Sequence, residues 1–510
     1  MLVKSNGSQT TIFRKNILAN YISQIYVTLI GILLLPMYIK YMGSEAYGLV
    51  GFFAMLQAWF GLLDLGLTPT IGRETARYRG GAVSVLAFRQ LYRALSVIFI
   101  TIAVLGGGAL FLSADLIAEN WLNLENLAVT DVVIAIQIMA ISVALRWMAG
   151  LHRGVVAGAE QLVWLSGFNA LVATLRFVGV FVSMWFFGFT PLVFFVHQFG
   201  IALLENIGLM LKTSQILPSK QCISTKIGWS FLPVKPVLKF SVTIAFTASV
   251  WVFVTQTDKL VLSGILPLDE YGYFTLAVLV ANGIMVLGGP VSSAIMPRMT
   301  RLFAENQHNE MINLYRKSTQ LIAIIAGSAS LTLVVAAKPL LAAWTGDDIV
   351  ATQSAPILQL YAMGNLFLSF TAMAYYLQYA LGNLRYHLMG NIGLAVILIP
   401  SIIIASSNFG GIGAGYVWLL MNVLYLFTWI AFVHHKLEPG LYIKWMLNDI
   451  VKILLPAALV ALSLFLIDIE IAGRLASLVF VVSVGIIVIA TAFTFSCYAS
   501  NFRRKYLQAN

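Results

Sequence analysis

Charged residues are scarce in this sequence. Asp, Glu, Lys and Arg make up 10% of the 510 residues, whereas hydrophobic residues make up 60%. A soluble protein would carry roughly 25% charged residues to cover its surface, so the composition excludes an ordinary water-soluble globular protein. Cysteine is also rare. Cys222 and Cys497 give no disulfide framework, and we expect two reduced thiols near the cytoplasmic face.

Several motifs of enzymes are missing as well. No glycine-rich loop followed by Lys and Ser or Thr is present, which excludes a built-in P-loop ATPase. The glycine cluster at 410–415 follows no predicted strand, and close helix packing explains it better. The six histidines lack the spacing of metal ligands. We therefore expect a protein that is not an enzyme and that has neither a metal site nor an organic cofactor.

Long apolar runs, in contrast, recur along the whole chain. Each is long enough to cross a hydrocarbon core of roughly 30 Å, and backbone groups in lipid must be satisfied internally, so these runs form helices. The sequence predicts an all-α integral membrane protein with about fourteen transmembrane helices. The predicted spans are 16–39, 46–68, 90–113, 128–149, 162–187, 190–211, 240–263, 272–294, 318–337, 352–378, 386–406, 411–433, 447–467 and 474–497.

The placement of charge predicts the orientation. No cleavage pattern follows the polar segment 1–15, so we expect the first span to be retained. If the N-terminus lies inside, most of the 31 basic residues fall in inner segments, and the outer segments carry mainly acids. The positive-inside rule then places both termini in the cytoplasm. The net charge of +11 is a topology signal and gives little reason to expect nucleic-acid binding.

The two halves of the chain share a short pattern. Four residues of the first half recur at one constant offset in the second half: Glu45, Tyr47, Gly48 and Arg77 recur as Asp269, Tyr271, Gly272 and Arg301. An even number of spans separates the copies, so both would insert in the same orientation. We therefore expect two six-helix lobes related by a pseudo-two-fold axis along the membrane normal.

The repeat and the charges predict five parts. These are a cytoplasmic N-terminus (1–15), an N-lobe (16–211), a linker (212–239), a C-lobe (240–433), and two accessory spans with a cytoplasmic C-terminus (434–510). The linker mixes lysines and prolines with Trp229, Phe231 and Leu232. This mixture is typical of an amphipathic segment on anionic lipid.

Charges inside spans cost about 2.5–3.5 kcal/mol each on insertion scales, so each needs a reason. Arg176 lies in the middle of the span 162–187. Glu205 on the next span lies at a depth that differs by about one helical turn. Two interpretations remain open: a structural ion pair with Glu205, or a cation that faces a polar cavity, with or without Glu205 nearby.

Other charges within spans are less distinctive. Asp258 and Lys259 are adjacent in the span 240–263. Neighbouring helical positions point about 100° apart, so we do not expect these side chains to pair; Lys259 could extend outward, and Asp258 more readily faces protein or water. Asp64 lies near a helix break, where a capping role is at least as plausible as a transport role.

Uncharged polar residues also occur within the spans. Most are expected to form hydrogen bonds between helices, and some to line a pathway: Asn20, Gln24, Gln57, Asn169, His197, Gln256, Asn282, Asn365 and Gln378. From this set and the charges we predict a substrate cavity. It contains Arg176, Asn169, Gln24, Gln256, Asn282 and Lys259.

Short motifs indicate a family. Residues 16–80 contain Tyr41-Met42-Gly43, Glu45-Ala46-Tyr47-Gly48 and Asp64-Leu65-Gly66, and a later segment runs from Asp258 to Gly264 and is followed by Tyr271-Gly272-Tyr273. Over roughly residues 12–435 the chain resembles the O-antigen (Wzx-type) flippases. These are the polysaccharide-export branch of the multidrug/oligosaccharidyl-lipid/polysaccharide (MOP) flippase superfamily.

The resemblance implies a function. Such a flippase moves undecaprenyl-diphosphate-linked oligosaccharide from the inner to the outer leaflet of the bacterial inner membrane by alternating access. Arg176 would attract the headgroup or an acidic sugar, and Asp258, Glu205 and Asp64 would couple transport to H⁺ or Na⁺. Partners would be membrane lipids and the lipid-linked oligosaccharide, and possible further partners are a polysaccharide polymerase and a chain-length regulator.

The sequence departs from its own repeat at one point. Leu34 and Leu35 occupy the first-lobe positions that match Asp258 and Lys259, so a symmetric binding site is not expected. Three alternatives stay open: a multidrug-type cation antiporter, a peptidoglycan-precursor flippase and, less favoured, a membrane glycan polymerase. A polymerase usually needs a sizeable extramembrane segment with acidic residues, and no predicted outer loop offers one.

Overall fold

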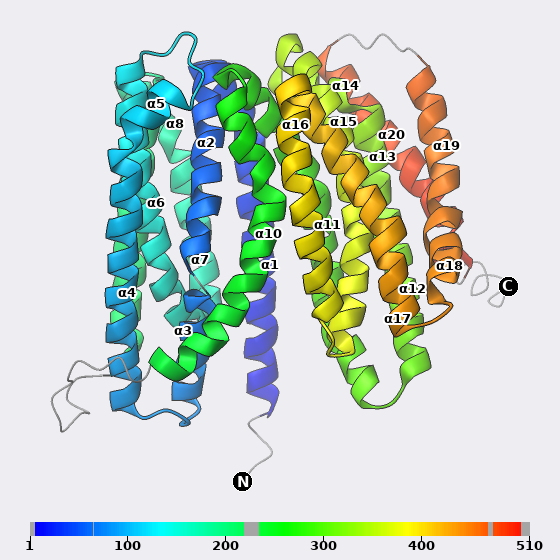
Figure 1. The fold of residues 1–510 in the computed structure, drawn as a ribbon, viewed down its shortest axis with the longest axis horizontal. Coiled ribbons are helices and arrows are strands. Elements are labelled where there is room, and N and C mark those ends of the chain that lie inside the picture. Colours follow the sequence, from blue (N-terminus) through cyan, green and yellow to red (C-terminus); the bar gives the residue numbers. More distant parts are fainter. Residues whose placement is uncertain (1–5, 65, 219–233, 468–472, 501–510) are drawn as a thin grey trace. The chain divides into compact units, whose positions relative to one another are not determined.

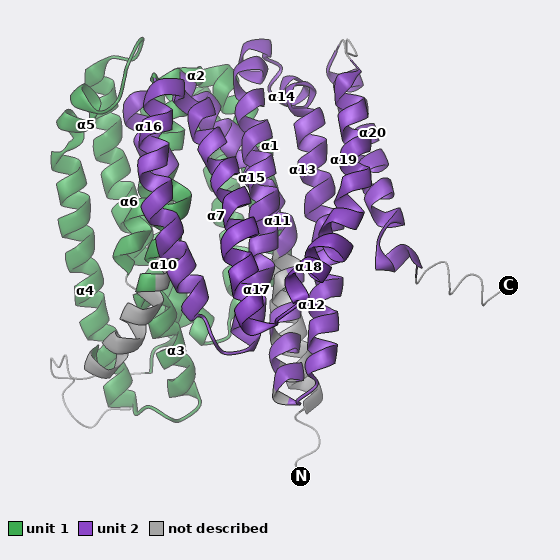
Figure 2. Ribbon diagram, turned by 45° about the vertical axis from the view of Figure 1, so that its right-hand side comes forward, with its two compact units in different colours: residues 1–256, 267–269 green, residues 257–266, 270–510 purple. Residues whose placement is uncertain are grey.

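The computed structural model describes residues 6–64, 66–218, 234–467 and 473–500, and within them all regular elements are helical. Contacts between Cα atoms divide the chain into two compact units (Figure 2). Unit 1 comprises residues 1–256 and 267–269, and unit 2 comprises residues 257–266 and 270–510. The long helix α10 (Lys235–Ile265) therefore belongs to both.

Unit 1 is a bundle of long helices that lie side by side (Figure 1). Its elements are α1 (Asn6–Met42), α2 (Ser44–Phe60), the 3₁₀ turn η1 (Gly61–Asp64), α3 (Leu67–Arg79), α4 (Val85–Leu112), α5 (Ala114–Asn120), α6 (Val129–Gly158), α7 (Leu162–Phe177), α8 (Gly179–Phe187) and α9 (Pro191–Ile216). Helix α6 is central, because it packs against α3, α4 and α9.

Unit 2 is also helical and includes three π-helical segments. Its elements are α11 (Leu268–Ala304), α12 (His308–Ile322), the π-helix η4 (Ala323–Gly327), α13 (Ser328–Val335), α14 (Ala337–Thr345), α15 (Asp348–Ala380), α16 (Arg385–Leu424), the π-helix η5 (Tyr425–Ile430), α17 (Ala431–Leu437), α18 (Leu441–Trp445), the π-helix η6 (Met446–Val451), α19 (Lys452–Leu466) and α20 (Arg474–Thr494). Buried residues of α15 pack against those of α12, η4 and η5 in one hydrophobic core.

Twelve helical stretches among the described residues are long and apolar enough to cross a membrane. One of them, Arg385–Leu437, has 53 residues and contains the predicted spans 386–406 and 411–433. Gly410 breaks the helical geometry between them, with φ 56° and ψ −141°. The predicted span 240–263 lies in α10, which is not among the twelve. The prediction of an all-α membrane protein is confirmed, and the count of fourteen stays a prediction.

The boundary between the units falls inside a helix. Sequence patterns divide the lobes at the linker 212–239, of which residues 219–233, including Cys222 and the aromatic residues, lie outside the described part of the chain. The units divide at residue 256. The ring of Phe253 on α10 meets Trp59 on α2 edge-on, at a centroid distance of 5.2 Å. This contact lies within unit 1, close to the point at which α10 passes from one unit to the other.

Small residues bring α3 close to α6. Gly150, Gly154 and Gly158 lie four residues apart on α6, a spacing typical of close helix approach in membranes. A Cβ atom on Gly154 would lie 2.6 Å from the carbonyl oxygen of Thr68 on α3, and one on Gly150 would lie 2.7 Å from the Thr68 hydroxyl oxygen. Larger residues would push α3 away. The contact fixes the start of α3 beside the polar residues of α6.

The repeated sequence pattern lies at the start of α2 in the first half of the chain and at the start of α11 in the second half. Glu45, Tyr47 and Gly48 lie in the first five residues of α2. Asp269, Tyr271 and Gly272 lie in the first five residues of α11. In unit 1 the buried Glu45 carboxylate accepts hydrogen bonds from the backbone N–H groups of residues 125, 126 and 127, at 2.9–3.3 Å. Glu45 therefore holds the loop that precedes α6.

Candidate functional site

Two neighbouring helices of unit 1 carry matched polar residues. Arg146 and Arg153 lie seven residues apart on α6, and Gln198 and Glu205 lie seven residues apart on α9. Arg146 donates a hydrogen bond to Gln198 (2.7 Å), and Arg153 forms an ion pair with Glu205. Seven residues are two helical turns. The two contacts therefore link α6 and α9 on the same pair of facing surfaces, two turns apart.

Arg146 forms the first of these contacts deep in the bundle. Its Nη1 donates to Gln57 Oε1 at 2.6 Å and its Nη2 to Gln198 Oε1 at 2.7 Å. The guanidinium carbon lies 5.0 Å from the centroid of the Phe53 ring, a distance that allows a cation–π interaction. The buried Nε has no hydrogen-bond partner among the described residues. Both hydrogen-bond partners of this guanidinium are neutral amides.

Arg176 lies in the last turn of α7, where the predicted span 162–187 breaks into two helices. The carbonyl oxygens freed by this break accept hydrogen bonds from other helices. Tyr38 donates to Phe177 O (2.8 Å), Gln198 donates to Arg176 O (3.1 Å), and His197 bonds Leu175 O (2.9 Å). The C-terminal end of a helix also favours a cation. These hydrogen bonds hold the backbone at the helix break and so position the Arg176 side chain.

Glu205 joins two of the arginines. Its Oε1 contacts Arg153, and its Oε2 lies 3.3 Å from Arg176 Nη2. The Glu205 side chain is 6% exposed, whereas those of Arg153 and Arg176 are 41% and 25% exposed. The carboxylate is therefore enclosed, and both cations reach open space.

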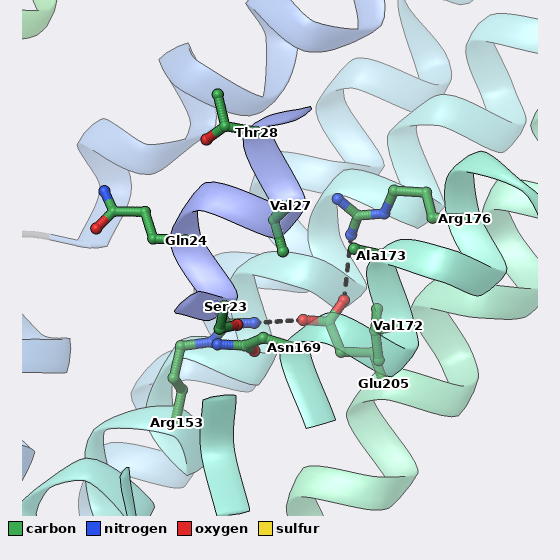
Figure 3. A pocket seen from close by; sticks show the side chains of 10 residues that line it. All are labelled: Ser23, Gln24, Val27, Thr28, Arg153, Asn169, Val172, Ala173, Arg176 and Glu205. Carbon is green, nitrogen blue, oxygen red and sulfur yellow. Dashed lines mark hydrogen bonds and ion pairs between the residues drawn. The ribbon is translucent and has the colours of Figure 1, made fainter. Parts of the chain in front are cut away.

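A hollow of about 410 Å³ lies beside this ion-pair group (Figure 3). Arg153, Arg176, Glu205 and Asn169 line it together with Ser23, Gln24 and Thr28 of α1. Ser23 itself donates to the carbonyl of Ser166 on α7, at 2.8 Å, which ties this part of α1 to the wall. The volume lies within the range of small-molecule sites.

A second hollow, of about 490 Å³, shares three of these residues. Arg153, Arg176 and Glu205 line both hollows, and Arg146, Gln57, Asp64 and Thr68 complete the second. Across the two hollows three arginines face two carboxylates, Glu205 and Asp64. Both hollows therefore have a net positive lining within candidate membrane spans, a setting suited to an anionic or heavily hydroxylated ligand.

The structure gathers part of the predicted cavity in unit 1. Arg176, Asn169, Gln24 and Glu205 line the first hollow, and Asp64 lines the second. Both interpretations of Arg176 hold at once, because it pairs with Glu205 and also faces a hollow. Asp64 caps the start of α3: its carboxylate accepts from the Thr68 N–H (3.2 Å) and hydroxyl (2.5 Å).

Other predicted residues are not among those that line these hollows. The buried Asp258 of unit 2 accepts from the Tyr361 hydroxyl at 2.6 Å. Lys259 Nζ lies 3.2 Å from Asp258 Oδ1, so the expectation that these neighbours do not pair is wrong, because the long lysine chain folds back along the helix. Asn282 on α11 accepts from Asn365, at 3.3 Å. Gln256 is half-buried on α10. None of these residues lines the two hollows.

The remaining polar positions mostly hold helices together. His197 bonds Ser183 at 2.8 Å, Asn365 accepts from Trp418 at 3.0 Å, and Gln378 accepts from the His387 N–H at 2.7 Å. The side chain of Asn20 lies outside the described part of the structure.

Sequence reasoning missed Arg146, Arg153 and Gln198 as members of the site. It counted both arginines with the basic residues of the inner side, although Arg146 lies within the predicted span 128–149 and only Arg153 lies beyond its end. Helix α6 in fact continues to Gly158, so Arg153 is part of a helix. The equal spacing of seven residues on α6 and α9 is a signal that could have found the three residues.

Solved structures of membrane transporters share this fold. The lipid II flippase MurJ, in an inward closed conformation, aligns with a TM-score of 0.69 at 14% identity and covers 96% of this chain and 99% of MurJ. An inward-facing multidrug resistance MATE family transporter of the MOP superfamily has a TM-score of 0.65 at 14% identity and covers 81% and 94%. A MOP superfamily transporter from Pyrococcus furiosus has a TM-score of 0.54 at 14% identity and covers 84% and 95%.

These alignments define the class: the chain has the fold of the transporters and flippases of the MOP superfamily. The sequence model of one family, described as polysaccharide biosynthesis protein, matches residues 13–303, which is more than half of the chain. The protein therefore belongs to the polysaccharide biosynthesis protein family. No curated protein matches its sequence.

Proposed function

We propose that the protein is a flippase for undecaprenyl-diphosphate-linked oligosaccharide, such as the repeat unit of O-antigen or of another surface polysaccharide. It moves this lipid from the inner to the outer leaflet of the bacterial inner membrane by alternating access. The observation that carries the proposal is the ion-pair group of unit 1, in which Arg153 and Arg176 share Glu205 beside a polar hollow.

The chemistry of the hollow supports a diphosphate or acidic-sugar cargo. Arginine presents a planar fork of N–H donors that matches phosphate and carboxylate oxygens. Arg176 retains a buried Nε without a hydrogen-bond partner in the described part of the chain, and Asn169 and Gln24 offer amide groups to sugar hydroxyls. A positive lining disfavours a cationic drug, so a multidrug-type cation antiporter is the weaker candidate.

A peptidoglycan-precursor flippase is the second candidate, and one observation favours it. MurJ aligns with 96% of the chain, whereas the MATE transporter aligns with 81% of it. Both flippase candidates use the same lipid carrier, so the arginine site suits either. The family described as polysaccharide biosynthesis protein favours the surface polysaccharide.

The proposal includes an orientation and partners. Both termini lie in the cytoplasm, because the basic residues gather at that side. The protein acts together with a polysaccharide polymerase and a chain-length regulator, which consume its product in the outer leaflet.

Ion coupling is assigned to unit 2. Asp258 is buried and contacts a lysine and a tyrosine hydroxyl, so gain or loss of its charge would alter both contacts. We expect Asp258→Asn to remove the dependence of flipping on the H⁺ or Na⁺ gradient, measured in proteoliposomes with and without each gradient. The matched control is Asp269→Asn, at the start of α11. An unchanged gradient dependence in Asp258→Asn would exclude this residue from coupling.

The function itself is tested by deleting the gene. Cells that lack the flippase should accumulate the lipid-linked repeat unit in the inner leaflet, where an externally added glycan-modifying enzyme cannot reach it. Lipid extracts with and without that enzyme measure this protection. Accumulation of the peptidoglycan precursor, with loss of cell-wall integrity, would instead favour the second candidate. Normal levels of both lipids would refute both candidates.

A further inference from the structure

A separate pocket of about 640 Å³ lies in unit 2. Helix α12 contributes Arg316 and Gln320, the π-helix η6 contributes Asn448 and Asp449, and Lys452 opens α19. The remaining wall consists of residues 494–497 and Ser500, at and just after the end of α20. None of these residues belongs to the proposed transport site.

The carboxylate of Asp449 in this pocket forms hydrogen bonds with two neighbouring side chains. The Asp449 side chain is 0% exposed and accepts from Arg316 Nε (2.6 Å), Arg316 Nη2 (3.3 Å) and Gln320 Nε2 (2.7 Å). Gln320 Oε1 in turn accepts from the Cys497 N–H, at 2.8 Å. The carboxylate is therefore neutralised within the wall, and the pocket offers no free anionic ligand for a metal ion.

The surplus charge of the pocket is positive. Lys452 is exposed and forms no ion pair among the described residues, and Nη1 of Arg316 is not used by Asp449. Burial raises the pKa of the Cys497 thiol, so the thiol is neutral and adds no negative charge. The Ser496 and Ser500 hydroxyls donate to backbone carbonyls, at 2.7 and 2.8 Å.

The donors that remain are two cations and one amide. The Asn448 side chain is exposed in the pocket wall beside Lys452, and its NH₂ group can donate together with Arg316 and Lys452. An ammonium, a guanidinium and an amide arranged around one space match the oxygens of a phosphate group.

The backbone at this pocket is irregular. Asn448 and Asp449 lie on the π-helix η6, and the π-helix η4 begins three residues after Gln320. The π-helix is rare and frequently occurs at functional sites. One π-helix therefore lines the pocket, and a second begins three residues beyond one of its lining residues. This observation does not depend on the charges of the pocket.

Apolar surface continues from the pocket along one helix. Leu455, Leu459 and Leu462 follow Lys452 at helical spacing on α19 and are 52–57% exposed. A phosphate bound at Lys452 could therefore be part of a lipid whose acyl chain lies along α19. In the proposed orientation Arg316 and Lys452 lie at the cytoplasmic side of the membrane, where anionic lipid headgroups attract Lys and Arg.

We propose that this pocket binds a phosphate-bearing anion, the headgroup of an anionic phospholipid or a soluble phosphate, through Arg316, Lys452 and Asn448. The site is distinct from the proposed cargo site and would hold a resident ligand of the two C-terminal helices.

Lys452→Ala tests the site without disturbing the buried pair, because Lys452 is exposed at the start of a helix. Native mass spectrometry of the purified full-length protein measures the binding of phosphatidylglycerol, phosphatidylethanolamine and inorganic phosphate. We expect phosphatidylglycerol to bind the unmodified protein more tightly than phosphatidylethanolamine, and Lys452→Ala to weaken it about fivefold. Lys444→Ala is the matched control, since Lys444 is exposed on α18 and does not line the pocket.

The three probes distinguish a phospholipid headgroup from a soluble phosphate as the bound anion. A loss of phosphatidylglycerol binding in Lys452→Ala, with no competition by millimolar inorganic phosphate, supports the lipid headgroup. Competition by inorganic phosphate supports a soluble anion. Equal binding of both probes to Lys452→Ala and Lys444→Ala overturns the proposal, and thermal unfolding of both variants confirms that each is folded.

Discussion

Replacement of Arg176 by alanine is expected to reduce surface polysaccharide by a factor of roughly ten to one hundred while the protein remains inserted and folded. Arg176 contributes one of the two contacts of Glu205, so Glu205 keeps Arg153 as a partner and the fold should survive. Loss of a charge-assisted hydrogen bond to the cargo costs about 1.5–3 kcal/mol, which is roughly a tenfold to hundredfold loss of transport. Glycan display on intact cells and flipping in proteoliposomes measure this loss.

Two variants serve as controls for Arg176→Ala. Arg176→Lys keeps the charge without the planar fork and should retain part of the activity. Arg77→Ala removes a positive charge that pairs with Glu74 at 3.1 Å, outside both hollows, and should leave activity unchanged. Normal glycan display in Arg176→Ala would remove this residue from the mechanism.

Replacement of Glu205 by alanine is expected to have the largest effect on stability. Its carboxylate is the shared counter-ion of Arg153 and Arg176, so its loss leaves two cations without a partner. Breaking a buried ion pair costs about 3–5 kcal/mol, and we expect about 3 kcal/mol because Arg153 stays partly exposed. Thermal unfolding of the purified protein should show a lower midpoint, and the yield of folded protein should fall.

A second variant separates charge from packing at Glu205. Arg153→Ala in the Glu205→Ala background removes one of the uncompensated cations and should restore part of the stability. If packing alone determined the stability, the double variant would be less stable than the single variant Glu205→Ala. A midpoint of Glu205→Ala equal to that of the unmodified protein would contradict the role of this carboxylate.

The helical fold and the family were accessible from the sequence because they depend on local patterns. The length of apolar runs predicted membrane helices, and the motifs from Tyr41 to Gly66 indicated the family that the comparison with residues 13–303 establishes. The limits of single helices were harder to predict. The apolar pattern of α6 fades after residue 149, yet packing against α3 and α9 keeps the chain helical to Gly158.

The site was predictable only in part. Arg176 and Glu205 stood out because a charge in lipid needs a partner, and both lie at one hollow. Which side chains complete the hollow depends on the rotation of α6 relative to α9, which no local pattern encodes. The break of α7 at Arg176 likewise depends on Tyr38, His197 and Gln198 from other helices.

The π-helices of unit 2 affect how this chain is compared with its relatives. A π-turn holds one residue more than an α-helical turn, so a relative that lacks η6 would carry one residue fewer between Trp445 and Lys452. Alignments that forbid gaps inside helices would then shift by one position at each of η4, η5 and η6. Asp449 would be matched with a neighbour of its true counterpart, and its pairing with Arg316 would pass unnoticed in a family survey.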